Sequence, residues 1–267
     1  MSIVTFTTDY GPRDYHVAIA KAQLLNLAPA SVIVDIANGV SHFDLIETAY
    51  LVKSCWKSFP MGTTHVIGVK SELKRLPLVA VKDNQYFVAS DNTVLPMILD
   101  AFPDELYEID LPLSDSDTFF PMGNIFMQIA AHLSRGGHPQ MIGKRTDFWE
   151  SQVFPVVNMT GGGIQCIVVH IDDYGNMALN FTKQMFYDYI GNRSFAIHAR
   201  SIQKTGLRTI YNTVNPTELG DGIPFAYWGE NGFLIIAMKN ATLQNGGGAA
   251  RLLGYQKMSK LLIEYND

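Results

Sequence analysis

The chain has 267 residues, of which 47% are hydrophobic and 17% charged, as in an ordinary globular protein rather than a disordered or fibrous one. With a formal net charge of -5, the chain lacks the excess of positive charge that binds a nucleic-acid backbone. The longest apolar runs are strand-length and fall far short of the roughly 20 residues of a membrane-spanning helix. We therefore expect no nucleic-acid partner and no membrane partner, and, because the N-terminus lacks the pattern of a signal peptide, a cytoplasmic protein.

The first half of the sequence alternates strand-like and helix-like segments. Apolar runs predict strands at 3–7, 32–36, 64–69, 78–81 and 86–89. Apolar residues at helical spacing predict helices at 15–27, 44–58, 93–101 and 124–135. Strands interleaved with helices imply an α/β domain over residues 1–150, built on a largely parallel sheet that helices cover on both faces.

The pattern changes after about residue 151. Short β-like runs, separated by Gly, Asn and Pro, follow one another at 164–171, 194–199, 223–228, 233–238 and 260–265. This spacing predicts a second, smaller β domain over residues 160–267. The fold class is therefore α/β with two domains.

The common cofactor and metal motifs are absent from the sequence. There is no P-loop, no Gly-rich dinucleotide turn after the first strand, no nucleophile elbow and no metal-binding helix motif. The seven histidines show no ligand spacing, and the two cysteines, Cys55 and Cys166, lie far apart in the chain. We expect no bound metal and no resident cofactor.

A first candidate cluster, Thr7-Thr8-Asp9-Tyr10-Gly11, directly follows the first predicted strand. Ligands of open α/β sheets bind beyond the carboxyl ends of the strands, and an aspartate there can accept hydrogen bonds from both hydroxyls of a ribose. The same aspartate could instead cap a helix or hold the turn at Gly11-Pro12. The residues alone leave both interpretations open.

A second cluster combines Asp172, Tyr174 and Asn176 at the end of the first predicted strand of the β domain. An aromatic face, an amide and a carboxylate make a reasonable set for binding a nucleobase next to a cationic group. Hairpin chemistry is the alternative, because Asp, Gly and Asn are turn residues. Taken without further context, the turn is the simpler interpretation.

Together, the two clusters resemble the family of S-adenosylmethionine (SAM) hydroxide adenosyltransferases, or adenosine-forming SAM hydrolases, which includes the SAM-dependent fluorinase and chlorinase. The likeness covers nearly the whole chain. Its segments are similar to family motifs, namely 8–11 to T-D-F-G, 43–44 to the end of P-F-D, 59–63 to F-P-E-G-T, 171–180 to I-D-x-F-G-N-x-x-x-N and 232–237 to G-Y-L-E-I-A.

The resemblance implies an N-terminal α/β domain, a C-terminal β-barrel-like domain, and a homotrimer whose sites lie between the N-terminal domain of one subunit and the C-terminal domain of the next. It implies that SAM or adenosine is the ligand, with SAM as substrate rather than cofactor. By the same resemblance Asp9 binds the ribose and Asp172 meets the methionine ammonium group. The pocket walls and the adenine site would be formed by Phe43, Phe120, Tyr174, Asn176, Asn240 and Ala241.

The sequence departs from the family at the residues of the reaction. The family's hydrolases carry an Asp-Arg-His set, but here Gly68 or Lys70 stands in place of the aspartate and Pro121 in place of the histidine. Glu72 and Arg75 remain as candidate catalytic residues.

Three functions therefore stay open: a SAM hydrolase with a rearranged polar set, a catalytically degenerate protein that binds SAM or adenosine, and an interaction module whose pocket is a relic. Lys70 bears on the choice because an ammonium group inside the pocket would repel the sulfonium of SAM. A solvent-facing Lys70 is the alternative that we prefer, because lysine is rarely buried unpaired.

Overall fold

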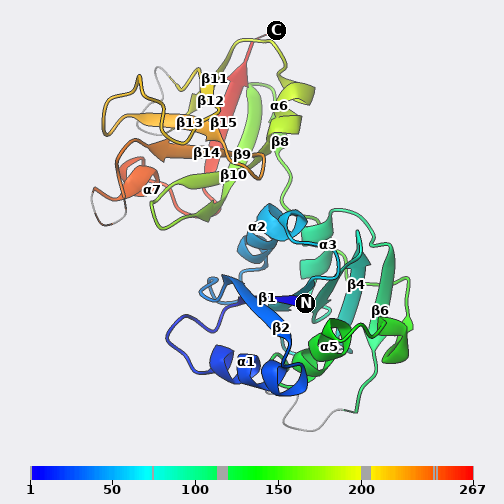
Figure 1. Ribbon diagram of the computed structural model, residues 1–267. Helices are drawn as coiled ribbons and strands as arrows, with labels where there is room; N and C mark the ends of the chain where they lie inside the picture. Colours follow the sequence, from blue (N-terminus) through cyan, green and yellow to red (C-terminus); the bar gives the residue numbers. More distant parts are fainter. Residues whose placement is uncertain are drawn as a thin grey trace. The chain divides into compact units, whose positions relative to one another are not determined.

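The computed structural model describes residues 2–73, 75–112, 120–199, 206–242, 244 and 246–266. The chain forms two compact units, Met1–Phe154 and Pro155–Asp267 (Figure 1). Each unit has a hydrophobic core of its own. The prediction of an α/β protein with a second, β-rich unit is confirmed.

In the described part of the first unit, the strands form one sheet in the order β2-β1-β3-β5-β4-β6-β7. The strands are β1 (Ser2–Thr8), β2 (Ser31–Ala37), β3 (Thr64–Gly68), β4 (Leu78–Lys82), β5 (Gln85–Ala89), β6 (Glu105–Ile109) and β7 (Gly143–Arg145). Two pairs of helices lie on opposite faces of this sheet, α1 (His16–Leu27) with α5 (Ile125–Ser134), and α2 (Leu45–Cys55) with α3 (Val94–Leu99) (Figure 1). The 3₁₀ turns are η1 (Trp56–Ser58) and η2 (Pro139–Met141).

The sheet is mixed rather than largely parallel, which corrects the sequence prediction. Strands β2, β1, β3 and β5 pair in parallel, whereas β4, β6 and β7 join the sheet antiparallel. The reason lies in the two residues between β4 and β5. Asp83 and Asn84 have φ of 50° and 56°, the backbone of a tight hairpin turn that sends the chain straight back.

The parallel half of the sheet contains a topological switch point. The chain passes from β1 to β2 on one side, then crosses to β3 on the other side of β1. Open α/β sheets bind ligands at the carboxyl ends of the strands where the order reverses in this way. Asp9, the residue after β1, stands at this point.

The strands of the second unit pair in the order β11-β15-β9-β10-β14-β13-β12, with β8 added to β9, in a sheet that curls upon itself (Figure 1). Their bounds are β8 (Asn158–Thr160), β9 (Gly163–Ile171), β10 (Met177–Thr182), β11 (Phe195–His198), β12 (Ile210–Tyr211), β13 (Pro224–Trp228), β14 (Phe233–Met238) and β15 (Lys260–Tyr265). Two short helices accompany it, α6 (Lys183–Tyr189) and α7 (Gly248–Leu252).

None of the helices in the described residues has the length and apolar character of a membrane span.

Candidate functional site

Three loops meet at the carboxyl ends of β1, β2 and β3, and Asp9 joins them. The Asp9 carboxylate is buried, and its Oδ2 accepts the backbone N–H of Phe43 at 2.9 Å and that of Lys70 at 3.4 Å. Both partners have positive φ, 61° and 47°, an uncommon backbone for residues other than glycine. Asp9 therefore fixes the shape of all three loops.

The helix-cap interpretation of Asp9 is wrong, because α1 begins only at His16 and no side chain caps it. The second carboxylate oxygen, Oδ1, has no hydrogen bond recorded to any of the described residues. An ionised carboxylate accepts at both oxygens, so Asp9 can order its own loops through Oδ2 and still bind a ligand through Oδ1.

The two predicted wall residues of this unit have different surroundings. Phe43 follows β2 and is 62% exposed, so its ring is available to contact a ligand. Phe120 is partly buried against the core, edge-on to Tyr10 and His16 at ring-centroid distances of 5.4 and 5.0 Å. Burial raises the pKa of Tyr10, so its phenol stays neutral and hydrogen-bonds to Ser71 at 3.3 Å.

The candidate catalytic pair, Glu72 and Arg75, is exposed beside a small cavity of about 140 Å³. Arg75 is already bound to Asp91 at 3.4 Å and lies over the ring of Phe148 at 4.9 Å. Glu72 lines the cavity with residues that include three other charged groups, Lys70, Asp91 and Glu150. Lys70 is thus partly buried and shares this cavity with three carboxylates.

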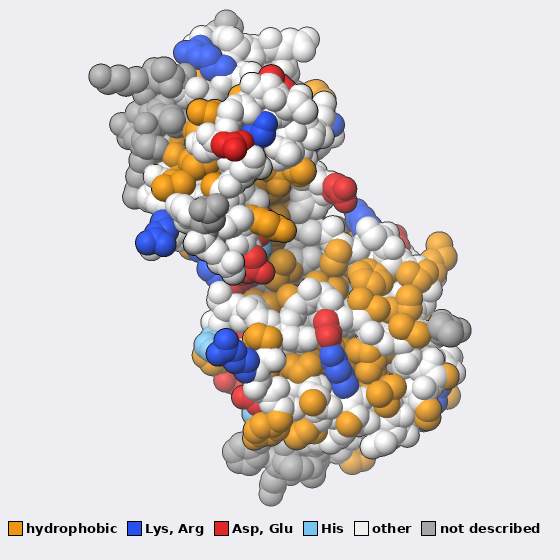
Figure 2. Space-filling view, turned by 60° about the vertical axis from the view of Figure 1, so that its left-hand side comes forward, with side chains coloured by type: hydrophobic (Ala, Val, Ile, Leu, Met, Phe, Trp, Pro, Cys, Tyr) orange, Lys and Arg blue, Asp and Glu red, His pale blue; other side chains and the backbone are white. Residues whose placement is uncertain are grey.

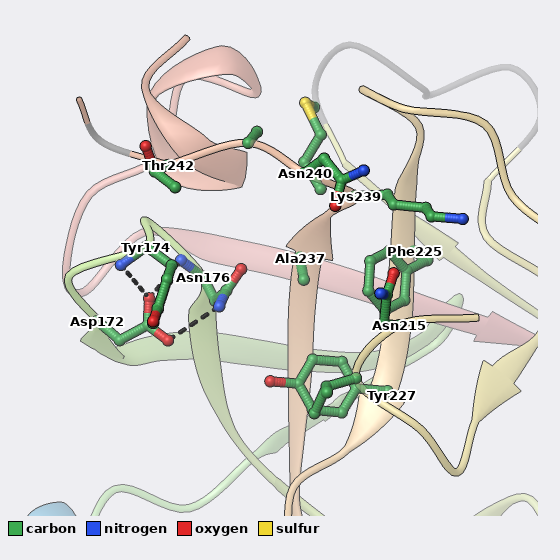
Figure 3. Close-up of a pocket in the computed structure, with 13 residues that line it drawn as sticks. Asp172, Tyr174, Asn176, Asn215, Phe225, Tyr227, Ala237, Lys239, Asn240 and Thr242 are labelled. Atoms are coloured by element: carbon green, nitrogen blue, oxygen red, sulfur yellow. Dashed lines mark hydrogen bonds between the residues drawn. The ribbon is translucent and has the colours of Figure 1, made fainter. Parts of the chain in front are cut away.

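The second unit contains a larger cavity of about 620 Å³, within the usual size of a small-molecule site (Figure 3). It brings together every residue that the sequence predicted in this half of the chain, Asp172, Tyr174, Asn176, Asn240 and Ala241. These residues come from the β9–β10 turn and from the segment after β14. The adjacency of β10 and β14 in the sheet explains why segments far apart in sequence meet here.

Asp172 organises the β9–β10 turn. Its Oδ1 accepts the backbone N–H groups of Tyr174 and Asn176 at 2.9 and 2.8 Å, and its Oδ2 accepts Asn176 Nδ2 at 2.9 Å (Figure 3). A carboxylate only accepts, so the amide of Asn176 has a fixed orientation with Nδ2 on Asp172. The Asn176 oxygen therefore remains as a hydrogen-bond acceptor for a ligand.

The turn is also supported from outside by α7. Gly248 has a φ of 63°, and a Cβ there would lie 2.2 Å from the carbonyl oxygen of Tyr174. Ala250 donates its N–H to the carbonyl of Gly175 at 2.9 Å. The ring of Tyr174, by contrast, is 62% exposed and free to stack against a flat ligand.

The opposite wall of the cavity was missed by sequence reasoning. The rings of Phe225 and Tyr227, neighbours on the same face of β13, stack at 5.7 Å, and the loop before β13 adds Val214 and Asn215 (Figure 3). The side chain of Lys239 holds this loop, its Nζ donating to the carbonyl of Pro216 at 3.0 Å. Aromatic residues two apart on the strand beside β14 were the only signal in the sequence.

No group of His, Cys, Asp and Glu suited to a metal ion occurs among the described residues. Both cysteines are free thiols, and burial raises the pKa of Cys55 to about 11 and that of Cys166 to about 12. Their thiolate forms are therefore scarce at neutral pH, and neither residue is suited to nucleophilic chemistry.

Comparison with known proteins identifies the family. Residues 4–143 match the SAM hydroxide adenosyltransferase N-terminal domain, and residues 166–261 match the C-terminal domain of the same family. The chain belongs to the SAM hydroxide adenosyltransferase family. Similar curated proteins are two (R)-S-adenosyl-L-methionine hydrolases, each 24% identical, from Thermus thermophilus (96% of this chain, 97% of that one) and Methanocaldococcus jannaschii (71% and 72%).

Solved structures share the fold over the full length. An uncharacterized conserved protein from Thermotoga maritima superposes with a TM-score of 0.80 at 22% identity, covering 98% of this chain and 99% of that one. A conserved hypothetical protein from Thermus thermophilus gives a TM-score of 0.72 at 20% identity over 100% of both chains.

Within this member of the family, the segments that by resemblance would carry the catalytic Asp and His pack together as an apolar contact. A Cβ at Gly68 would lie 2.0 Å from the sulfur of Met122, next to the buried Pro121. An aspartate therefore cannot occupy position 68 while Met122 fills this space.

Proposed function

We propose that this protein hydrolyses SAM to adenosine and methionine. One observation carries the proposal: a single cavity joins the five residues of the second unit that the family resemblance assigns to one ligand. The relatives named as SAM hydrolases support it, since one of them aligns with 96% of the chain.

The side chains suit the parts of the substrate. The fixed oxygen of Asn176 fits the exocyclic amine of adenine, which donates hydrogen bonds, and the exposed Tyr174 ring fits its flat face. Asp9, with Oδ1 available, fits the two ribose hydroxyls. Oδ1 of Asp172 accepts two hydrogen bonds and Oδ2 accepts one, and a carboxylate oxygen can accept a further bond, so Asp172 can bind the methionine ammonium group without leaving the turn.

The chemistry makes modest demands on the protein. Water attacks C5′ of the ribose while the C5′–S bond breaks, and sulfur leaves as a neutral thioether because the sulfonium already carries positive charge. The leaving group therefore needs no acid. The main tasks are to align water opposite sulfur, to remove competing solvent and to accept one proton.

We further propose that the active form is a homotrimer whose sites combine the Asp9 loops of one subunit with the large cavity of the next. Exposed apolar side chains support association, and they include Tyr15 just before α1, Ile19 and Leu25 on α1, and Val32 on the edge strand β2.

Chromatography of SAM incubated with the purified protein tests the function. We expect equal amounts of adenosine and methionine, and calorimetry should detect adenosine binding. Adenosine binding without product formation would favour the degenerate binding protein. If adenosine and SAM at millimolar concentration give neither a heat of binding nor a thermal shift, only the interaction module with a relic pocket would remain. Incorporation of a halide in place of water would exclude the hydrolase.

A further inference from the structure

His42 lies directly beside Asp9, on the loop between β2 and α2. Its side chain is exposed, and its Nδ1 is 3.0 Å from the backbone oxygen of Asp9. A carbonyl oxygen only accepts hydrogen bonds, so Nδ1 carries the ring proton. In the neutral ring the other nitrogen, Nε2, is then the one with a free lone pair, and none of the described residues hydrogen-bonds to it.

The loop that carries His42 is held at several points. The next residue, Phe43, donates its N–H to the Asp9 carboxylate, and Asp44 caps α2 by accepting the N–H of Glu47 at 2.9 Å. The imidazole is therefore attached to the residue proposed to bind the ribose, by a backbone that is itself fixed. C5′ belongs to the same sugar as the hydroxyls that Asp9 would bind, so a ribose bound there would bring the reacting carbon into the neighbourhood of this ring.

Several other groups near this end of the sheet are less suited to accept a proton. Gly68 and Met122 form an apolar contact, and Arg75 is bound to Asp91. Lys70 is a cation among carboxylates. The imidazole of His16 is packed between the rings of Tyr10 and Tyr15, with its Nδ1 on Asp14 at 2.7 Å.

We propose that His42 is the general base of SAM hydrolysis in this protein, an inference that rests on the proposed function. As the water oxygen bonds to C5′, one water proton moves to His42 Nε2. The electron pair of the broken C5′–S bond stays on sulfur. Adenosine and methionine leave, and the imidazolium releases its proton to solvent.

Two substitutions separate a base from a residue that only positions Asp9. His42→Asn keeps an amide donor at about the place of Nδ1 but has no basic nitrogen, whereas His42→Gln places its amide near Nε2. General-base catalysis contributes roughly a hundredfold to ten-thousandfold, so both variants should lose at least about a hundredfold in kcat. Adenosine affinity, measured by calorimetry, should stay within about fivefold of wild type.

His138→Gln is the matched control, because His138 is also an exposed histidine of the first unit but lies at the start of η2. It should keep wild-type turnover. Added imidazole should restore part of the turnover of His42→Ala, which a purely structural role would not allow. Wild-type turnover that persists in His42→Asn would overturn the assignment of His42 alone. A wild-type protein that forms no adenosine would overturn the proposed function and this inference together.

Discussion

Asp9 combines two roles that the sequence presents as alternatives. It holds the loops after β2 and β3 through Oδ2, and it is proposed to bind the ribose through Oδ1. Asp9→Asn retains an oxygen for the two backbone N–H groups but loses the charge. Because hydrogen bonds to charged groups are worth roughly 1 kcal/mol more than neutral ones, calorimetry should show adenosine affinity falling about tenfold with little change in unfolding.

Asp9→Ala should lower both adenosine affinity and stability more than Asp9→Asn does. It removes both ribose contacts, and affinity should fall about a hundredfold or more. It also leaves the N–H groups of Phe43 and Lys70 without their acceptor, which should lower the free energy of unfolding by about 1 to 3 kcal/mol in urea titrations. As a control, wild type should discriminate against 2′-deoxyadenosine and Asp9→Ala should not. Equal discrimination by both proteins would remove Asp9 from the site.

His65 makes the stability of the first unit sensitive to acid. The ring is fully buried between Thr5 and Gln85, and this burial lowers its pKa to about 4. Between about pH 6.5 and pH 4, His65 is protonated in the unfolded chain but not in the folded chain. Stability from this group is therefore complete above pH 6.5 and is lost as the pH falls, by about 3 kcal/mol at pH 4.

Urea unfolding of wild type and His65→Gln between pH 4 and pH 7.5 measures this contribution. His65→Gln should be less stable at pH 7.5, but its stability should fall less steeply with acid. Parallel curves for the two proteins would show that His65 titrates normally in the folded state.

At the scale of elements, Lys239 positions one wall of the large cavity. Its ammonium group bonds the carbonyls of Pro216 and Leu219, in the loop that contributes Val214 and Asn215. Lys239→Met keeps the aliphatic stem but releases the loop, so we expect adenosine affinity to fall about tenfold and amide exchange to rise over residues 212–221. Lys260→Met, which changes an exposed lysine of the same unit, should do neither.

The sequence predicted those elements whose burial produces a regular apolar pattern. β14 is buried almost throughout and reads as an apolar run, and β1 is buried over most of its length with Ile3, Val4 and Phe6 as its apolar residues. β10 was missed because it contains Asn180, which is buried and bonds the backbone of Ile167 and of Pro155. A buried amide interrupts the pattern from which strands are predicted, although its hydrogen bonds are satisfied.

The candidate site was predictable to a similar extent. Asp9 and the turn that begins at Asp172 directly follow strands, where polar residues signal a function. Val214 and Asn215 come from a loop whose place is set by Lys239, a contact of more than 20 positions in sequence that no local pattern reveals. His42 has no ligand spacing in the sequence, because its partner is a backbone oxygen 33 positions away.

At the scale of the molecule, the residues that we propose to bind one ligand are divided between two units. Asp9, His42 and Phe43 belong to the first unit, and the large cavity belongs entirely to the second. Hydrophobic side chains also gather on one face of the first unit (Figure 2), and the edge strand β2 has a row of backbone groups without a neighbouring strand among the described residues. Both features support the proposed homotrimer.

The homotrimer makes a definite prediction. Light scattering during size-exclusion chromatography should give a mass near three times the 29.7 kDa of the chain, about 89 kDa, and calorimetry should find one adenosine per chain. Because each site would need two subunits, dilution that dissociates the trimer should weaken adenosine binding and abolish turnover together. His138→Gln, an exposed substitution in the first unit, should leave the mass unchanged. A monomer that binds adenosine with undiminished affinity at the same concentration would contradict the trimer, because each chain would then contain a complete site.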